Sequence, residues 1–74
     1  MTLGEYRVGI SFNPSKNPAV DEIKRAAADL IDLIDDIKSG DDSKEIPRLK
    51  ALAMTHIEDA AMWAVKAATK QPFV

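Results

Sequence analysis

The second half of the chain, residues 46–70, is rich in apolar positions that do not keep to one side of a helix. Leu49, Leu52 and Ile57 share a face. Other apolar side chains cover most of the remaining circumference: Ala53, Met54, Ala61, Met62, Trp63, Val65 and Ala68. A helix that is hydrophobic nearly all round is normally buried on several sides. We therefore expect a helix over residues 46–70 whose apolar surface exceeds what one small chain covers, and which needs further copies or another partner.

Residues 18–38 carry the narrower pattern of an amphipathic helix. Its apolar residues recur at alternating spacings of three and four, which is the seam of a coiled coil. They are Val20, Ile23, Ala27, Leu30, Ile34 and Ile37. Ala26, Ile31 and Leu33 widen this seam, so we expect the helix to contact more than one neighbour. Asn17 is a suitable N-cap, Pro18 suits the first helical position, and Gly40 is a common residue after a helix end. The short polar linker at 39–45 predicts that the two helices are antiparallel neighbours.

Residues 1–17 form an N-terminal arm in which apolar and polar residues alternate. The alternating apolar residues are Tyr6, Val8, Ile10 and Phe12. This period of two suits an extended segment, and two Asn-Pro steps near its end disfavour regular structure. The sequence thus predicts one all-α domain over residues 1–74, a two-helix antiparallel hairpin with an extended N-terminal arm.

Composition and charge narrow the classes of function. The chain has 74 residues, no Cys and one His, which excludes disulfides and thiolate metal sites and argues against a zinc cluster. So small a domain gains stability most readily by oligomerisation. A formal net charge of −2 argues against binding of long DNA or RNA but leaves room for a small anionic ligand. Without a signal-peptide pattern or an uninterrupted apolar span, we expect a soluble cytoplasmic protein that does not enter membranes.

The sequence offers no convincing catalytic centre, so we expect a protein without enzymatic activity, cofactor or metal. His56 is adjacent to Thr55, but successive helical residues point about 100° apart, which places that hydroxyl poorly for a general base. A hydrolase that uses His56 is therefore the least favoured of the readings. Glu58 and Asp59 are more simply a solvated patch or partners in salt bridges between helices.

A ligand could be held where the arm meets the helix starts. Phe12 is an aromatic residue in a proline-rich loop, Lys24 follows near the start of the first helix, and Arg48 opens the second. An aromatic ring stacks on a base, whereas cations and a free helix N-terminus neutralise phosphates. In the alternative, Phe12 staples the arm to the hairpin and Lys24 is solvated. Spacing alone favours this alternative.

The residues from Leu49 to Lys70 nevertheless resemble the C-terminal helix of a family of small phage hairpin proteins. The most specific part of the resemblance is Thr55–Lys66. In the arm, Arg7 and the aromatic-polar-proline run at 12–14 are similar too. The helix that follows has the family's Ile-Lys step, here at 23–24. The family includes the anti-CBASS and anti-Thoeris sponges, which sequester cyclic nucleotide messengers of bacterial immunity.

This resemblance implies a helical homo-oligomer, typically a hexamer, that binds ligand between protomers in the host cytoplasm during infection and cleaves nothing. Implied ligands are cyclic dinucleotides, and also cyclic trinucleotides or cyclic ADP-ribose isomers. The implied ligand-binding residues are Phe12, Asn13, Pro14, Lys24, Arg48 and Thr55. Phe12 would stack on a base and Lys24 would contact phosphate, whereas Arg48 and Thr55 would add contacts from the second helix. The runner-up function is a non-enzymatic module that binds a host protein and no nucleotide.

Overall fold

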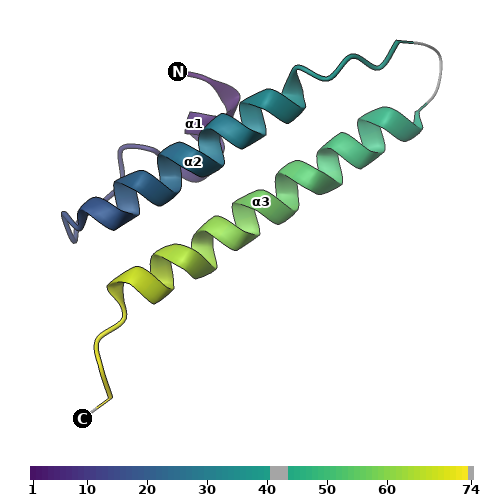
Figure 1. The fold of residues 1–74 in the computed structure, drawn as a ribbon. Helices are drawn as coiled ribbons and strands as arrows, with labels where there is room; N and C mark the ends of the chain where they lie inside the picture. The colour runs from purple at the N-terminus through teal and green to yellow at the C-terminus, as the bar shows by residue number, and fades with distance from the viewer. Residues whose placement is uncertain (41–43, 74) are drawn as a thin grey trace.

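The computed structural model describes residues 1–40 and 44–73. Its helices are α1 (Leu3–Val8), α2 (Pro18–Asp35) and α3 (Glu45–Thr69), and no strand occurs in the described part of the chain. Helices α2 and α3 run antiparallel along their length, and α1 lies against α2 (Figure 1). The predicted all-α hairpin is confirmed.

Local chemistry sets the limits of the hairpin helices. Asn17 caps α2, its Oδ1 accepting a hydrogen bond of 2.9 Å from the backbone N–H of Ala19. The helix expected over 18–38 ends at Asp35. Helix α3 begins at Glu45, rather than at residue 46, and stops one residue before Lys70, whose backbone is extended. The linker expected at 39–45 includes residues 41–43, which lie outside the described residues.

The N-terminal arm is not extended throughout, and the prediction of an extended arm is wrong for α1. Thr2 and Glu5 form a capping box, in which each side chain accepts a hydrogen bond from the other residue's backbone N–H. Gly9 closes α1 in the left-handed conformation, with φ 64° and ψ 57°. These caps make a short helix of a segment whose alternation of apolar residues suggested a strand.

Contacts with α2 then hold α1 in place. The backbone N–H of Gly4 donates to Asp32 Oδ1 at 2.7 Å, and a Cβ at Gly4 would lie 2.1 Å from the carbonyl oxygen of Ala28. Only glycine therefore allows this approach of the two backbones. A salt bridge of 2.8 Å joins Glu5 to Arg25, and this guanidinium lowers the pKa of Glu5. Helix α1 is thus docked on α2 by both shape and charge.

The core between the helices is small. Its buried apolar residues are Val20, Ala27, Ala28, Ile31, Met54 and Ala61. The expected apolar face of α2 is only partly correct. Val20, Ala27 and Ile31 are buried as expected, but Leu30 and Leu33 are exposed, and Ala28 is buried outside that face. Ala28 is buried because Gly4 of α1 packs against it. Lys24 of α2 is also buried. The alternative interpretation of the sequence, in which Lys24 is solvated, is therefore wrong.

Much of the apolar surface stays uncovered in the single chain. The molecule measures 55 × 25 × 12 Å, so its smallest dimension is about that of one helix with its side chains. Large apolar side chains are exposed on both hairpin helices: Leu30, Leu33, Leu49, Leu52, Met62 and Trp63. Ile37, just beyond the end of α2, is exposed too. One hairpin therefore does not bury the apolar surface of α3. In the described residues no helix is both long and apolar enough to cross a membrane.

Candidate ligand-binding site

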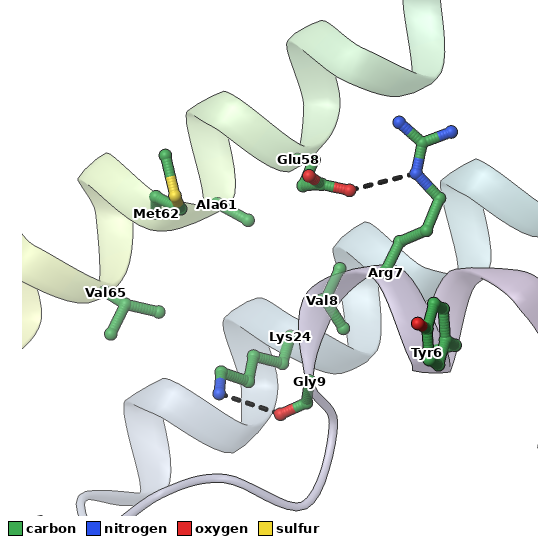
Figure 2. A pocket seen from close by; sticks show the side chains of 9 residues that line it. All are labelled: Tyr6, Arg7, Val8, Gly9, Lys24, Glu58, Ala61, Met62 and Val65. Carbon is green, nitrogen blue, oxygen red and sulfur yellow. Dashed lines mark hydrogen bonds and ion pairs between the residues drawn. The ribbon is translucent and has the colours of Figure 1, made fainter. Parts of the chain in front are cut away.

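Two adjoining cavities lie between the N-terminal segment and α3. Cavity A, of about 420 Å³, is lined by Tyr6, Arg7, Val8, Gly9, Lys24, Glu58, Ala61, Met62 and Val65 (Figure 2). Cavity B, of about 270 Å³, is lined by Phe12, Asn13, Pro14, Ser15, Val20, Lys24, Val65 and Thr69. Lys24 and Val65 line both cavities, which makes them neighbouring parts of one groove.

Lys24 is the central polar group of this groove. Its side chain comes from α2 and is only 8% exposed. The ammonium donates hydrogen bonds to the carbonyl oxygens of Gly9, at 2.9 Å, and of Phe12. Its Nζ also lies 5.5 Å from the centre of the Phe12 ring, within range of a cation–π contact. No carboxylate of the described residues forms a salt bridge with Lys24, so this buried charge is matched only by neutral partners.

The loop between α1 and α2 is shaped around this lysine. The N–H of Phe12 donates to the carbonyl oxygen of Gly9 at 2.9 Å, which turns the chain so that both carbonyls reach Lys24 Nζ. A second turn follows, in which Lys16 N–H donates to the carbonyl of Asn13 at 3.1 Å and Lys16 adopts φ 56°. The Phe12 ring is left 71% exposed at cavity B. It does not staple the arm to the hairpin.

Two asparagines fix the far end of the loop. Asn13 Nδ2 donates to the carbonyl of Asn17 at 2.9 Å and to Asp21 Oδ1 at 3.1 Å, and Asn13 Oδ1 accepts from Ser15 Oγ at 2.7 Å. Asn17 Nδ2 reaches across to the carbonyl of Ala68 at 3.1 Å, near the end of α3. The side-chain hydrogen bonds of Asn13 are thus made within the loop and to the start of α2. Together with Pro14, Asn13 lines cavity B beside Phe12.

A second polar cluster bridges α1 and α3 at cavity A. Arg7 Nε donates to Glu58 Oε1 at 2.9 Å, and Arg7 Nη2 donates to Thr55 Oγ1 at 3.3 Å. Figure 2 shows the Arg7–Glu58 pair between the two helices, above the cavity. Glu58 is thus a salt-bridge partner between helices, as one reading of the sequence held. Its partner comes from α1, a helix that the sequence analysis did not foresee.

The structure brings together some of the predicted site residues and separates others. Phe12, Asn13, Pro14 and Lys24 meet at cavity B. Thr55 lines neither cavity and reaches cavity A only through Arg7.

Arg48 lies in the first turns of α3, away from both cavities, in a 2.8 Å salt bridge with Glu45. This guanidinium lowers the pKa of Glu45. Within one chain, Arg48 is therefore separate from the other candidates.

Of the residues that line cavity A, sequence reasoning assigned only Lys24 to a site and missed three polar side chains: Tyr6, Arg7 and Glu58. The signal that could have found Tyr6 and Arg7 is the Thr2-x-x-Glu5 capping box followed by Gly9, which marks α1 and places both residues in its last turn. Among residues 1–40 and 44–73 no cluster of three or more His, Cys, Asp or Glu side chains is arranged to hold a metal ion.

Comparison with known families gives one finding. The family model described as Acb2/Tad1, hairpin domain, matches residues 5–69, which is most of the chain and includes both cavities and the hairpin. Comparisons with curated proteins and with solved structures found no match.

Proposed function

Because the chain belongs to the Acb2/Tad1 hairpin-domain family, the anti-CBASS and anti-Thoeris sponges, we propose that it sequesters cyclic oligonucleotide messengers without cleaving them. Family membership gives the general role of a phage anti-defence sponge. The finer function proposed here is capture of cyclic dinucleotides, and of cyclic trinucleotides or cyclic ADP-ribose isomers, in the host cytoplasm, which blocks CBASS-type signalling.

The observation that carries this proposal is the buried ammonium of Lys24. Burial of a charge is costly unless it is paired, and carbonyl dipoles compensate it only in part. Lys24 has two carbonyl partners and a third N–H that no hydrogen bond uses in the described residues. A phosphate at the junction of the two cavities would supply the missing negative charge.

Phe12 supports the same ligand class. An aromatic ring that is largely exposed beside a buried cation offers a stacking surface for a base next to a phosphate contact. Asn13 and Pro14 hold this ring at the rim of cavity B, so their role in the proposed site is to shape the wall. Arg48 and Thr55 belong to the proposed site only if another protomer brings them to it.

We propose further that the protein is a homo-oligomer, a hexamer by analogy with the family, whose protomers complete the pockets. The support is the set of large apolar side chains that α2 and α3 leave exposed. A typical soluble monomer exposes such side chains singly rather than several on the same helices. Helix α3 also carries small residues that suit close helix packing. These small residues are Ala60, Ala61, Ala64, Ala67 and Ala68.

Phe12→Ala tests the proposed site. Loss of one base–aromatic stack costs about 1–3 kcal/mol, so we expect the dissociation constant for a cyclic dinucleotide to rise roughly tenfold or more. The thermal stability of the free protein should hardly change, because the ring is exposed. Phe73→Ala is the matched control, since Phe73 is a fully exposed ring outside both cavities.

Calorimetric titration measures this affinity, and release by heat distinguishes a sponge from an enzyme. The ligand should be recovered intact after the protein is denatured, whereas cleaved product would contradict sequestration. If no cyclic dinucleotide, cyclic trinucleotide or cyclic ADP-ribose isomer raises the melting temperature, the proposal fails.

The exposed apolar side chains of α3 favour a second candidate, a non-enzymatic module whose hairpin packs against a host protein. That function requires no anion beside Lys24. A protein that stays monomeric, ignores the nucleotide panel and binds a host protein through α3 would support the second candidate over the first.

A further inference from the structure

Glu58 is the acidic side chain on the wall of cavity A, and among the described residues no other carboxylate lines either cavity. Its Oε1 accepts from Arg7 Nε at 2.9 Å, whereas Oε2 has no hydrogen-bond partner in the part of the chain that the structure describes. The side chain is 39% exposed and lines the cavity, so a bound ligand can contact it. An acidic group in a groove proposed to take an anion calls for an explanation of its own.

Arg7 holds this carboxylate in one orientation. Its guanidinium contacts Glu58 Oε1 through Nε and Thr55 Oγ1 through Nη2, so it bridges two side chains one turn apart on α3. Because Arg7 belongs to α1, which is docked on α2, the clamp connects all three helices. A carboxylate fixed in this way needs little further ordering when it binds a ligand.

The rest of the wall of cavity A is mostly apolar. Its wall between Glu58 and Lys24 is formed by Val8, Ala61, Met62 and Val65, and the Tyr6 ring lies at its α1 side (Figure 2). A volume of about 420 Å³ lies within the range of about 300–1,000 Å³ for small-molecule pockets. The cavity thus has a hydrogen-bond acceptor at one end, an ammonium at the other and apolar walls between them.

We propose that cavity A holds a nucleobase of the captured ligand and that Glu58 reads its hydrogen-bonding edge, which selects guanine over adenine. This inference rests on the proposed function. An ionised carboxylate only accepts hydrogen bonds. Guanine presents two adjacent donors on its Watson–Crick edge, N1–H and the N2 amino group, whereas adenine presents one donor beside an acceptor. Glu58 is thus a specificity-determining residue, and Arg7 is the residue that positions it.

Glu58→Gln tests the assignment directly. The amide keeps the length of the side chain and an oxygen for Arg7 Nε, so the tie between α1 and α3 is preserved. It offers one donor and one acceptor, the pattern by which Gln pairs with adenine. We expect the ratio of affinities for cyclic di-GMP and cyclic di-AMP to fall by roughly tenfold or more, since a bidentate base contact contributes about 1–3 kcal/mol of discrimination.

Calorimetric titration of both dinucleotides gives the ratio. Glu22→Gln is the matched control, because Glu22 is an exposed glutamate on α2 that lines neither cavity, and it should leave the ratio unchanged. Glu58→Asp keeps a group that only accepts hydrogen bonds, and it should retain the preference for guanine even where both affinities fall.

The outcomes separate this inference from the function on which it rests. Tight binding by the wild-type protein with the same ratio in Glu58→Gln would overturn base reading while leaving the sponge intact. An equal loss of both ligands in Glu58→Gln and Glu58→Asp would also overturn it, because Glu58 would then only support the fold. Failure of the folded wild-type protein to bind any cyclic nucleotide would instead overturn the proposed function itself.

Discussion

At the scale of single residues, the feature that most needs explaining is Lys24, which is buried without a salt-bridge partner among residues 1–40 and 44–73. Lys24 holds the carbonyls of Gly9 and Phe12, and in doing so it sets the path of the loop that presents the Phe12 ring. The same ammonium lies where the two cavities meet. One side chain therefore builds the loop in the free protein and is available to a phosphate in the complex.

Lys24→Met separates these two roles by measurement. Methionine keeps the apolar stem but leaves two carbonyls without their donor, so we expect the free protein to lose about 1–3 kcal/mol of stability in urea unfolding. Binding of a cyclic dinucleotide should fall further than this destabilisation explains, because the phosphate loses its cation. Lys16→Met, an exposed lysine of the same loop, should change neither quantity. A Lys24→Met variant that binds ligand normally would contradict the proposed phosphate contact.

At the scale of the elements, α1 determines the shape of the site. It contributes Tyr6, Arg7 and Val8 to cavity A, and its position depends on the contact of Gly4 with α2. The gap between α1 and α3 is bridged by Arg7, with Glu58 and Thr55 as its partners. A change in the docking of α1 would thus alter cavity A without touching any residue that lines it.

Gly4→Ala is the substitution that tests this dependence. The added Cβ would lie 2.1 Å from the Ala28 carbonyl oxygen, so α1 must shift away from α2. Overpacking of this kind costs roughly 1–3 kcal/mol. We expect faster amide hydrogen exchange in α1 and weaker ligand binding, with α2 and α3 still paired. Unchanged exchange in α1 would show that its docking tolerates the methyl group.

The elements also show how far sequence reasoning reaches. The hairpin followed from local signals, because the Asn17 cap, the apolar periodicity and the short linker all favour it. In the arm, the alternation from Tyr6 to Phe12 favours an extended segment, whereas the capping box and the left-handed Gly9 favour a helix. The helix forms because its docking on α2, which buries Gly4, adds to the effect of the caps. Alternation alone could not reveal that tertiary contact.

The candidate site was predictable only in part for the same reason. Phe12, Asn13 and Pro14 are consecutive, and Lys24 is two turns into the helix that follows, so their meeting at cavity B follows from a short loop. Arg7 and Glu58 are 51 residues apart and meet only after three helices pack. No local sequence pattern relates residues so far apart, so cavity A could be found only from the structure.

At the scale of the whole molecule, the hairpin leaves large apolar side chains exposed. Trp63 is 61% exposed in the single chain, where its Nε1 donates to Asp59 Oδ1 at 3.2 Å and Lys66 lies over its ring. Met62 and the more distant Leu49 and Leu52 are exposed on the same helix. In the proposed oligomer these side chains are buried between protomers.

Trp63→Ala tests whether this surface assembles the particle. Truncation of a buried aromatic costs roughly 3–5 kcal/mol, and that loss would fall on the oligomer because the ring is exposed in one chain. We expect the variant to sediment as smaller species at micromolar concentration while it remains helical by circular dichroism. An unchanged sedimentation coefficient would place Trp63 outside the interface.

The central claim, that copies of this hairpin assemble and hold intact cyclic nucleotides, is tested most directly by native mass spectrometry with a mixed panel. The panel contains cyclic dinucleotides, cyclic trinucleotides and cyclic ADP-ribose isomers, and the spectrum reports copy number and bound mass together. We predict a homo-oligomer, a hexamer by family analogy, that carries ligands of unchanged mass. A monomer that carries none of them would contradict the account.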